Sequence, residues 1–85
     1  MDAEVVLAGV ATYAKKDMSY VPTHGADSAR WHATVGLVDF ELLLTGPKFW
    51  DCHERVGGGG AVDLAMHLLR CDFRAAVKRL RAAGF

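Results

Sequence analysis

The stretch VDFELLL at residues 38–44, followed by the turn TGPK at 45–48 and by FWDC at 49–52, decides the fold. Within the first segment, apolar residues recur at every second position and two acidic residues fall between them. This is the period of a strand with one buried face. The Gly-Pro pair is a turn former, and the aromatic run after it restarts a strand. The two segments therefore predict an antiparallel hairpin.

Working outward, residues 30–35 form a short run with Trp31, Thr34 and Val35, which predicts a third strand before Gly36. Four consecutive glycines at 57–60 then separate the sheet from a helical end. Residues 61–70 carry apolar side chains on most of their surface, with a polar stripe of Asp63, His67 and Arg70. This helix should be the most buried of the chain.

A last helix is expected after Asp72, a good N-cap, with Gly84 as its C-terminal stop. Its predicted core face is Phe73, Ala76, Val77 and Leu80, at positions i, i+3, i+4 and i+7. With the hairpin and the preceding helix, this places the core between sheet and helices. The largely buried set should be Phe40, Leu42, Leu64, Leu68, Phe73, Val77 and Leu80.

The N-terminal segment 1–16 shows apolar residues at helical spacing, with Asp2 placed to cap it and Lys15 and Lys16 at its C-terminal end. Residues 18–28 predict an extended passage and loop, because Pro22, Gly25, Asp27 and Ser28 disfavour regular structure. The expected fold is α+β: a first helix, a small antiparallel sheet of about three strands, and two packed C-terminal helices.

Composition limits the function. The 85 residues make one small domain, and ten Lys and Arg balance ten Asp and Glu, which excludes a protein that coats nucleic acid through bulk positive charge. No apolar run reaches the roughly 18–20 residues needed to cross a bilayer. The acidic start has the wrong sign for a secretion signal, so we expect a soluble, cytoplasmic chain.

In such a compartment the two cysteines, Cys52 and Cys71, are expected to be free thiols. Together with His53 and His67 they are the one assembly that could bind a metal. However, adjacent residues of a strand point to opposite faces, which disfavours joint ligation by Cys52 and His53. His67 is more simply an i, i+4 partner of Asp63. We therefore expect no metal and no cofactor.

Other chemical motifs are weak. The glycine run could cradle a phosphate at a helix N-terminus, but it lacks the Gly-Lys-Ser/Thr ending of a P-loop, and a packed link between sheet and helix is the simpler interpretation. Asp39 and Glu41 share one strand face, which is ordinary for a solvated surface. Neither a nucleophile nor an acid–base pair stands out, so the domain alone is not expected to be an enzyme.

The basic residues are more informative. Arg74, Lys78 and Arg81 are spaced four and three apart, which predicts a basic face on the last helix, opposite Phe73 and Val77. A solvated helix face is the alternative explanation. In a regular strand either Phe49 or Trp50 must point away from the core. An exposed ring there could stack on a base, or it could pair across the sheet with Trp31.

Three segments, KFWDC at 48–52, GGGGAVDL at 57–64 and CDFRAAV at 71–77, resemble the N-terminal zinc-binding domain of bacterial DNA primases. The similarity covers roughly residues 30–83. It is nearest to the degenerate form in primase-like proteins of plasmids, phages and integrated elements. In that form a Trp-containing strand, a Thr-Gly-x-Lys-Phe turn and a glycine run replace the zinc knuckle.

The resemblance implies a zinc-ribbon-like fold without its zinc. Cys52 stands where the first cysteine of the family's second ligand pair would be, but Arg55 occupies the second position and no Cys-x-x-His lies upstream. It also implies a module that engages single-stranded DNA template beside a primase, polymerase or helicase domain. The alternative is a protein–protein interaction or scaffold module that kept the fold and lost DNA binding. The expected nucleic-acid contacts are Arg74, Lys78 and Arg81, assisted by Lys48, Arg55 and Trp50.

Overall fold

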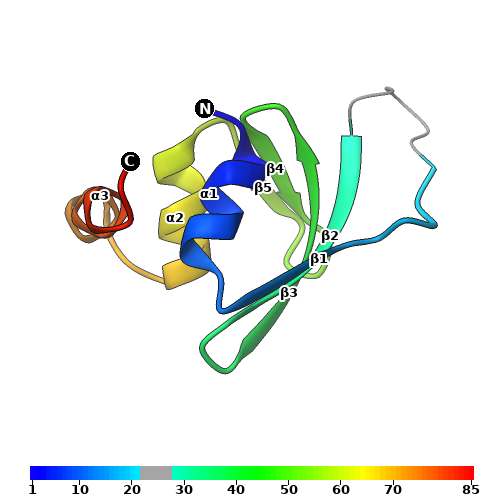
Figure 1. Cartoon of the computed structure of the whole chain (residues 1–85), viewed down its shortest axis with the longest axis horizontal. Coiled ribbons are helices and arrows are strands. Elements are labelled where there is room, and N and C mark those ends of the chain that lie inside the picture. The colour runs from blue at the N-terminus through cyan, green and yellow to red at the C-terminus, as the bar shows by residue number, and fades with distance from the viewer. Residues whose placement is uncertain (22–27) are drawn as a thin grey trace.

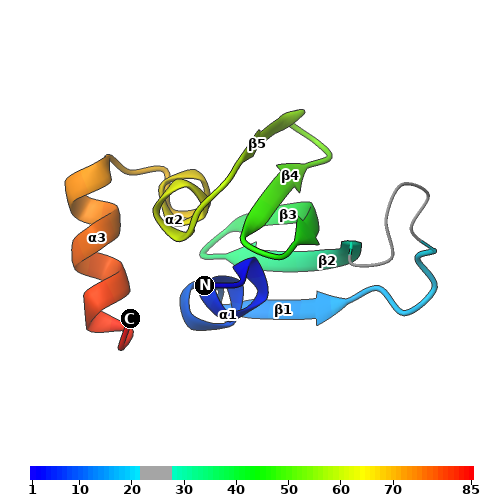
Figure 2. The ribbon, with the colours of Figure 1, turned by 90° about the horizontal axis from the view of Figure 1, so that it is seen from above.

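The computed structural model describes residues 1–21 and 28–85. The chain is α+β, with an N-terminal helix, a five-stranded antiparallel sheet and two C-terminal helices. Its strands follow one another in the order of the sequence (Figure 2). The elements are α1 (Ala3–Val10), β1 (Tyr13–Lys16), β2 (Ser28–Val35), β3 (Val38–Thr45), β4 (Lys48–Asp51), β5 (Val56–Gly58), α2 (Ala61–Leu69) and α3 (Phe73–Ala82).

The central strand of the sheet, β3, pairs with β2 on one side and, in the predicted hairpin, with β4 on the other. β2 and β3 pair along their whole length, from Ser28 opposite Thr45 to Val35 opposite Val38. β4 continues the meander, with Leu42 opposite Asp51. The fold class is confirmed, but the sheet has five strands instead of about three.

The two additional strands lie at the edges of the sheet. The helix expected over residues 1–16 ends at Val10, and Tyr13–Lys16 form β1 against β2. A bond from the Thr12 amide to the Thr34 carbonyl begins this pairing. Lys15 and Lys16 therefore lie on an exposed edge strand. Asp2 occupies the N-cap position, but its side chain makes no capping hydrogen bond.

β5 contains the first half of the glycine run. A Cβ on Gly57 would lie 2.6 Å from the Phe49 carbonyl oxygen, and one on Gly58 would lie 2.9 Å from the Asp63 Cβ. Only glycine therefore allows this strand to sit between β4 and the start of α2. The packed-link interpretation is supported for these two residues. Gly59 and Gly60 have open space around them.

The molecule has a sheet layer, a layer of α1 and α2 against one face of it, and α3 outside α2 (Figure 1). The inner face of the sheet contributes Phe40, Leu42, Leu44 and Phe49 to the core. From the helices come Val6, Leu7, Leu64, Ala65, Leu68, Ala76 and Leu80. The apolar period of residues 38–44 thus packs as predicted, although Val38 itself, at the hairpin, is exposed.

The other sequence expectations have mixed outcomes. Asp72 caps α3 by accepting a hydrogen bond from the Ala75 amide at 2.8 Å, and Gly84 adopts φ +95° just after the helix, as predicted. Ser28 belongs to β2 and not to a loop. The expected turn formers Pro22, Gly25 and Asp27 lie outside the described residues.

Candidate nucleic-acid interface

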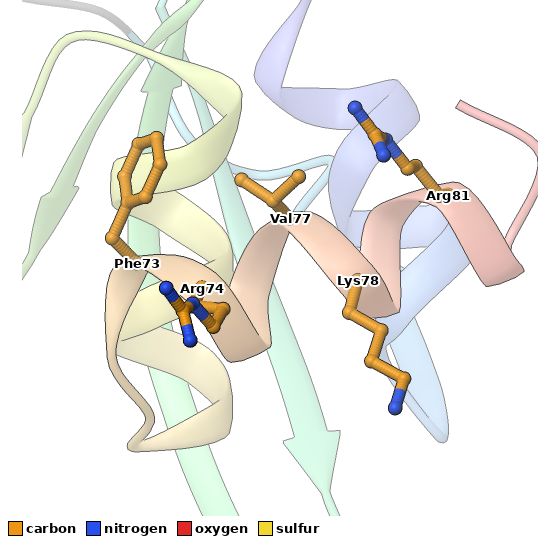
Figure 3. Close-up of a pocket in the computed structure, with 5 residues that line it drawn as sticks. All are labelled: Phe73, Arg74, Val77, Lys78 and Arg81. Atoms are coloured by element: carbon orange, nitrogen blue, oxygen red, sulfur yellow. The ribbon is translucent and has the colours of Figure 1, made fainter.

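The outer surface of α3 carries an open groove of about 420 Å³. Five residues of the helix line it (Figure 3): Phe73, Arg74, Val77, Lys78 and Arg81. Three of the side chains are cationic and two are apolar. The predicted trio Arg74, Lys78 and Arg81 is therefore brought together on one surface.

Helical geometry explains the arrangement. At about 100° per residue, positions 73, 77, 81, 74 and 78 follow one another within an arc of about 140°. The cations thus adjoin the Phe73–Val77 stripe, and the expectation that they lie opposite it was wrong. The buried positions, Ala76 and Leu80, lie on the other flank of the stripe.

The prediction that Phe73 and Val77 are largely buried was also wrong. The Phe73 side chain is 64% exposed, and Val77 is only half-buried. The helix buries just Ala76 and Leu80, because it packs on the far side of α2 and does not reach the sheet (Figures 1 and 2). A large aromatic ring at its first turn therefore stays at the surface, where it lines the same groove as Arg74.

The charge on α3 is not neutralised locally. The helix holds four basic residues and no acidic one. Arg74, Lys78 and Arg81 are exposed, and none of them forms an ion pair within the described part of the chain. The nearest acid in sequence, Asp72, is occupied as the N-cap. The overall neutral charge of the chain thus conceals a strongly basic helix.

The remaining predicted contacts lie elsewhere. Trp50 is 43% exposed on β4 and points away from the core, whereas its neighbour Phe49 is buried. The strand period predicted that one of the two would point outward, and the structure shows that it is Trp50. Lys48 begins the same strand, and Arg55 lies in the turn after it with φ +59°. α2 separates this edge from α3 (Figure 2). The six residues therefore form two surfaces and not one.

On the uncovered face of the sheet, Arg30, Glu41 and His53 form one group of paired charges. Arg30 forms an ion pair with Glu41, and the imidazole of His53 lies 3.3 Å from the same carboxylate. The hydrogen bond from Arg30 holds the pKa of Glu41 below its usual range, although burial opposes the shift. Asp39 accepts a bond from Thr34. Alternating acids predicted only solvation here, and nothing in the residue pattern indicated that Arg30 would pair with Glu41.

A second feature missed by the sequence joins the sheet to α2. Asp51 is 1% exposed, and its Oδ2 lies 2.6 Å from His67 Nε2. Burial alone would raise the pKa of Asp51, but hydrogen bonds from the Glu54 amide, His67 and the His53 amide outweigh it and lower the pKa. His67 was expected to pair with Asp63, one turn away. Its partner is instead 16 residues distant, and only the fold brings the two together.

The metal-binding assembly considered from sequence does not form. His53 faces Glu41 and His67 faces Asp51, while Cys52 and Cys71 are free thiols. Burial raises the pKa of the Cys52 thiol, which disfavours a reactive thiolate. With Arg55 at the second cysteine position and no upstream pair, the residues present do not fit the zinc knuckle that the resemblance describes.

Comparison of the chain with protein-family models, with curated proteins and with solved structures finds no match in any of the three. Among the described residues, none of the helices has both the length and the apolar character needed to cross a membrane.

Proposed function

We propose that this domain is a non-catalytic module that binds single-stranded DNA through the outer surface of α3. The observation that carries the proposal is the exposed Phe73 ring in the same groove as three cations without ion-pair partners. Within a primase-like replication or mobile-element protein, such a module would engage template beside a primase, polymerase or helicase domain.

The chemistry of the groove suits a single strand. Cationic side chains attract backbone phosphates without reading sequence, and an exposed aromatic ring offers a surface on which an unpaired base can stack. In a duplex the bases are stacked on one another and their faces are hidden, so Phe73 would have no partner there. A single strand of DNA can place its phosphates near the cations and stack a base on Phe73 at the same time.

The resemblance to primase zinc-binding domains adds to this argument. The order of elements it implies, an antiparallel sheet, a glycine run, an apolar helix and a last helix, matches the order in this chain. That agreement concerns fold. The site is argued from α3 itself, since fold alone does not specify function.

Trp50 offers a separate stacking position on the sheet. Its ring is exposed and Lys48 lies on the same strand face two residues away, but the nearby Arg30 is engaged by Glu41. Around Trp50 the sheet therefore offers fewer available cations than the groove of α3. We assign it a secondary role, with Lys48 and Arg55 contacting DNA only where the strand extends beyond α3.

A second candidate function is docking of a partner protein on α3. Phe73 and Val77 stand one helical turn apart, the spacing of apolar anchors in helix recognition. A partner with carboxylates around an apolar stripe would complement the basic rim. Both candidates use one surface, so the ligand that binds it distinguishes them.

Mapping by NMR tests the proposal. Amide shifts of the labelled domain would be followed during titration with an oligo-dT strand, with the same sequence in duplex form as control. The proposal predicts the largest changes over residues 73–81 and weaker binding of duplex. Changes confined to residues 48–58 would move the site to the sheet. Absence of changes at micromolar to millimolar DNA would favour the docking function.

A further inference from the structure

Three potential metal ligands converge where the turn between β4 and β5 meets α2. They are Asp51 Oδ2, Glu54 Oε2 and His67 Nε2, and they all lie within 4.8 Å of one another. No other such group of three or more His, Cys, Asp or Glu side chains occurs in residues 1–21 and 28–85. None of the three residues belongs to the ligand positions that the primase resemblance implies.

Each ligand is held in place by a neighbour. Asp51 Oδ1 accepts the His53 and Glu54 amides at 2.8 and 3.0 Å, which turns Oδ2 toward His67. Arg70 binds both oxygens of Glu54. The His67 ring lies between Phe40 and Phe49, with centroid distances of 5.6 and 5.3 Å. Oriented ligands of this kind are typical of metal sites, where outer groups fix the inner ones.

The distances suit a small ion. Tetrahedral zinc with ligand bonds of about 2.0–2.1 Å places neighbouring ligand atoms about 3.3 Å apart. His67 Nε2 and Glu54 Oε2 are already separated by 3.5 Å. His67 Nε2 and Asp51 Oδ2, at 2.6 Å, would have to part by about 0.7 Å and lose the proton between them.

From this geometry we infer that Asp51, Glu54 and His67 form a binding site for a divalent transition-metal ion, with zinc the best fit. One imidazole and two carboxylates favour zinc over magnesium and calcium, which prefer sites made of oxygen alone. Glu54 is 42% exposed and keeps the site open to solvent, so water completes the coordination.

The site differs from a structural zinc knuckle. Asp51 is already hydrogen-bonded to His67 and to two backbone amides, and Glu54 is paired with Arg70, so the domain folds without the ion. Binding would then fasten the turn after β4 to α2 and add stability in proportion to the metal concentration. Arg70 stays on Glu54 as an outer neighbour, which moderates the affinity by charge repulsion.

To test this inference, the chelator-treated domain is titrated with zinc chloride and the heat of binding is measured by isothermal titration calorimetry. We expect one ion per chain, a rise in melting temperature with zinc, and visible absorption bands of tetrahedral cobalt when cobalt chloride replaces zinc. His67→Gln, which keeps a hydrogen-bond donor for Asp51, should abolish binding. Glu54→Gln at the exposed ligand should weaken it without unfolding the domain.

Two control variants separate this site from other ligands. His53→Gln removes an exposed imidazole that faces Glu41, and Cys52→Ser combined with Cys71→Ser removes both thiols; both should bind zinc like the wild type. Absence of zinc binding by the wild type at micromolar metal would overturn the inference. The inference would also be overturned if the cysteine variant lost zinc binding while the folded Glu54→Gln variant bound zinc like the wild type.

Discussion

α2 and α3 are consecutive helices of nearly equal length, yet they differ in how much of their surface is buried. In α2 only Asp63 is exposed, and Leu64, Ala65 and Leu68 are buried. In α3 only Ala76 and Leu80 are buried, and the cations share the open side with Phe73. α2 therefore holds the molecule together, whereas α3 offers a surface. Substitutions in α2 should change stability, and those in α3 should change binding.

The sharpest test of this contrast compares two large apolar residues. Leu64→Ala removes a fully buried side chain and should cost about 2–5 kcal/mol of unfolding free energy. Phe73→Ala removes an exposed ring and should cost no more than about 0.5 kcal/mol. Urea unfolding measures both. An equal cost for the two would mean that Phe73 packs in the core in solution and that the contrast is wrong.

The polar junction between sheet and α2 should come next in stability. Asp51→Asn removes the charge that His67 faces and should cost about 1–3 kcal/mol, because a buried hydrogen-bonding group loses its best partner. Thermal and urea unfolding of the metal-free domain measure it. His32→Gln, at an exposed position of the uncovered sheet face, is the matched control and should change stability little. A negligible effect of Asp51→Asn would show that the contact between Asp51 and His67 does not stabilise the fold.

For DNA binding we expect the opposite result: substitutions in α3 should weaken binding more than they change stability. Phe73→Ala is expected to weaken single-stranded DNA binding by about 1–3 kcal/mol, the value of one stacked base, with little change in salt dependence. Trp50→Ala should have a similar effect only with strands long enough to reach the sheet, and a smaller one with short strands. Fluorescence anisotropy with two oligonucleotide lengths measures this. A dominant Trp50 effect with short strands would transfer the primary site to β4.

The smallest effect is expected from the uncovered sheet face. The pKa of Glu41 is lowered by Arg30, so the pair contributes stability that is present above the ordinary glutamate pKa of about 4.3 and is lost as pH falls through the lower folded value. Partial exposure of Arg30 limits this to less than about 1 kcal/mol. Between pH 7 and pH 3, the wild type should lose more stability than Glu41→Gln. Equal losses would show that the pair contributes nothing.

Sequence reasoning succeeded where a periodic pattern extended over many residues. The alternation at residues 38–44 and the apolar residues of 61–70 predicted β3 and α2 because one buried face repeats several times in each. β1 and β5 were not predicted because they are too short to show an alternating pattern: β1 has four residues, and β5 has three, two of them glycines. These edge strands form by pairing with a neighbour that is specified elsewhere in the chain.

The candidate site divides in the same way. The spacing of Arg74, Lys78 and Arg81 on one surface is local and was predicted. The exposure of Phe73 was not, because it depends on where α3 crosses α2, which a helical period does not contain. The contact between Asp51 and His67 depends on tertiary structure alone. Long-range polar pairs of this kind leave no mark in a single sequence.

The salt dependence of binding to a short single-stranded oligonucleotide tests the central claim most directly. Each phosphate neutralised adds roughly 0.7 to the slope of log affinity against log salt. The combined Arg74→Ala, Lys78→Ala and Arg81→Ala variant should therefore flatten the slope by about two units, weakening all sequences alike. The combined Lys15→Ala, Lys16→Ala and Lys48→Ala variant removes the same charge from the sheet and should leave the slope near that of the wild type. Equal flattening by the two variants, or no salt-dependent binding of the wild type at micromolar concentration, would contradict the assignment of α3 as the DNA-binding surface.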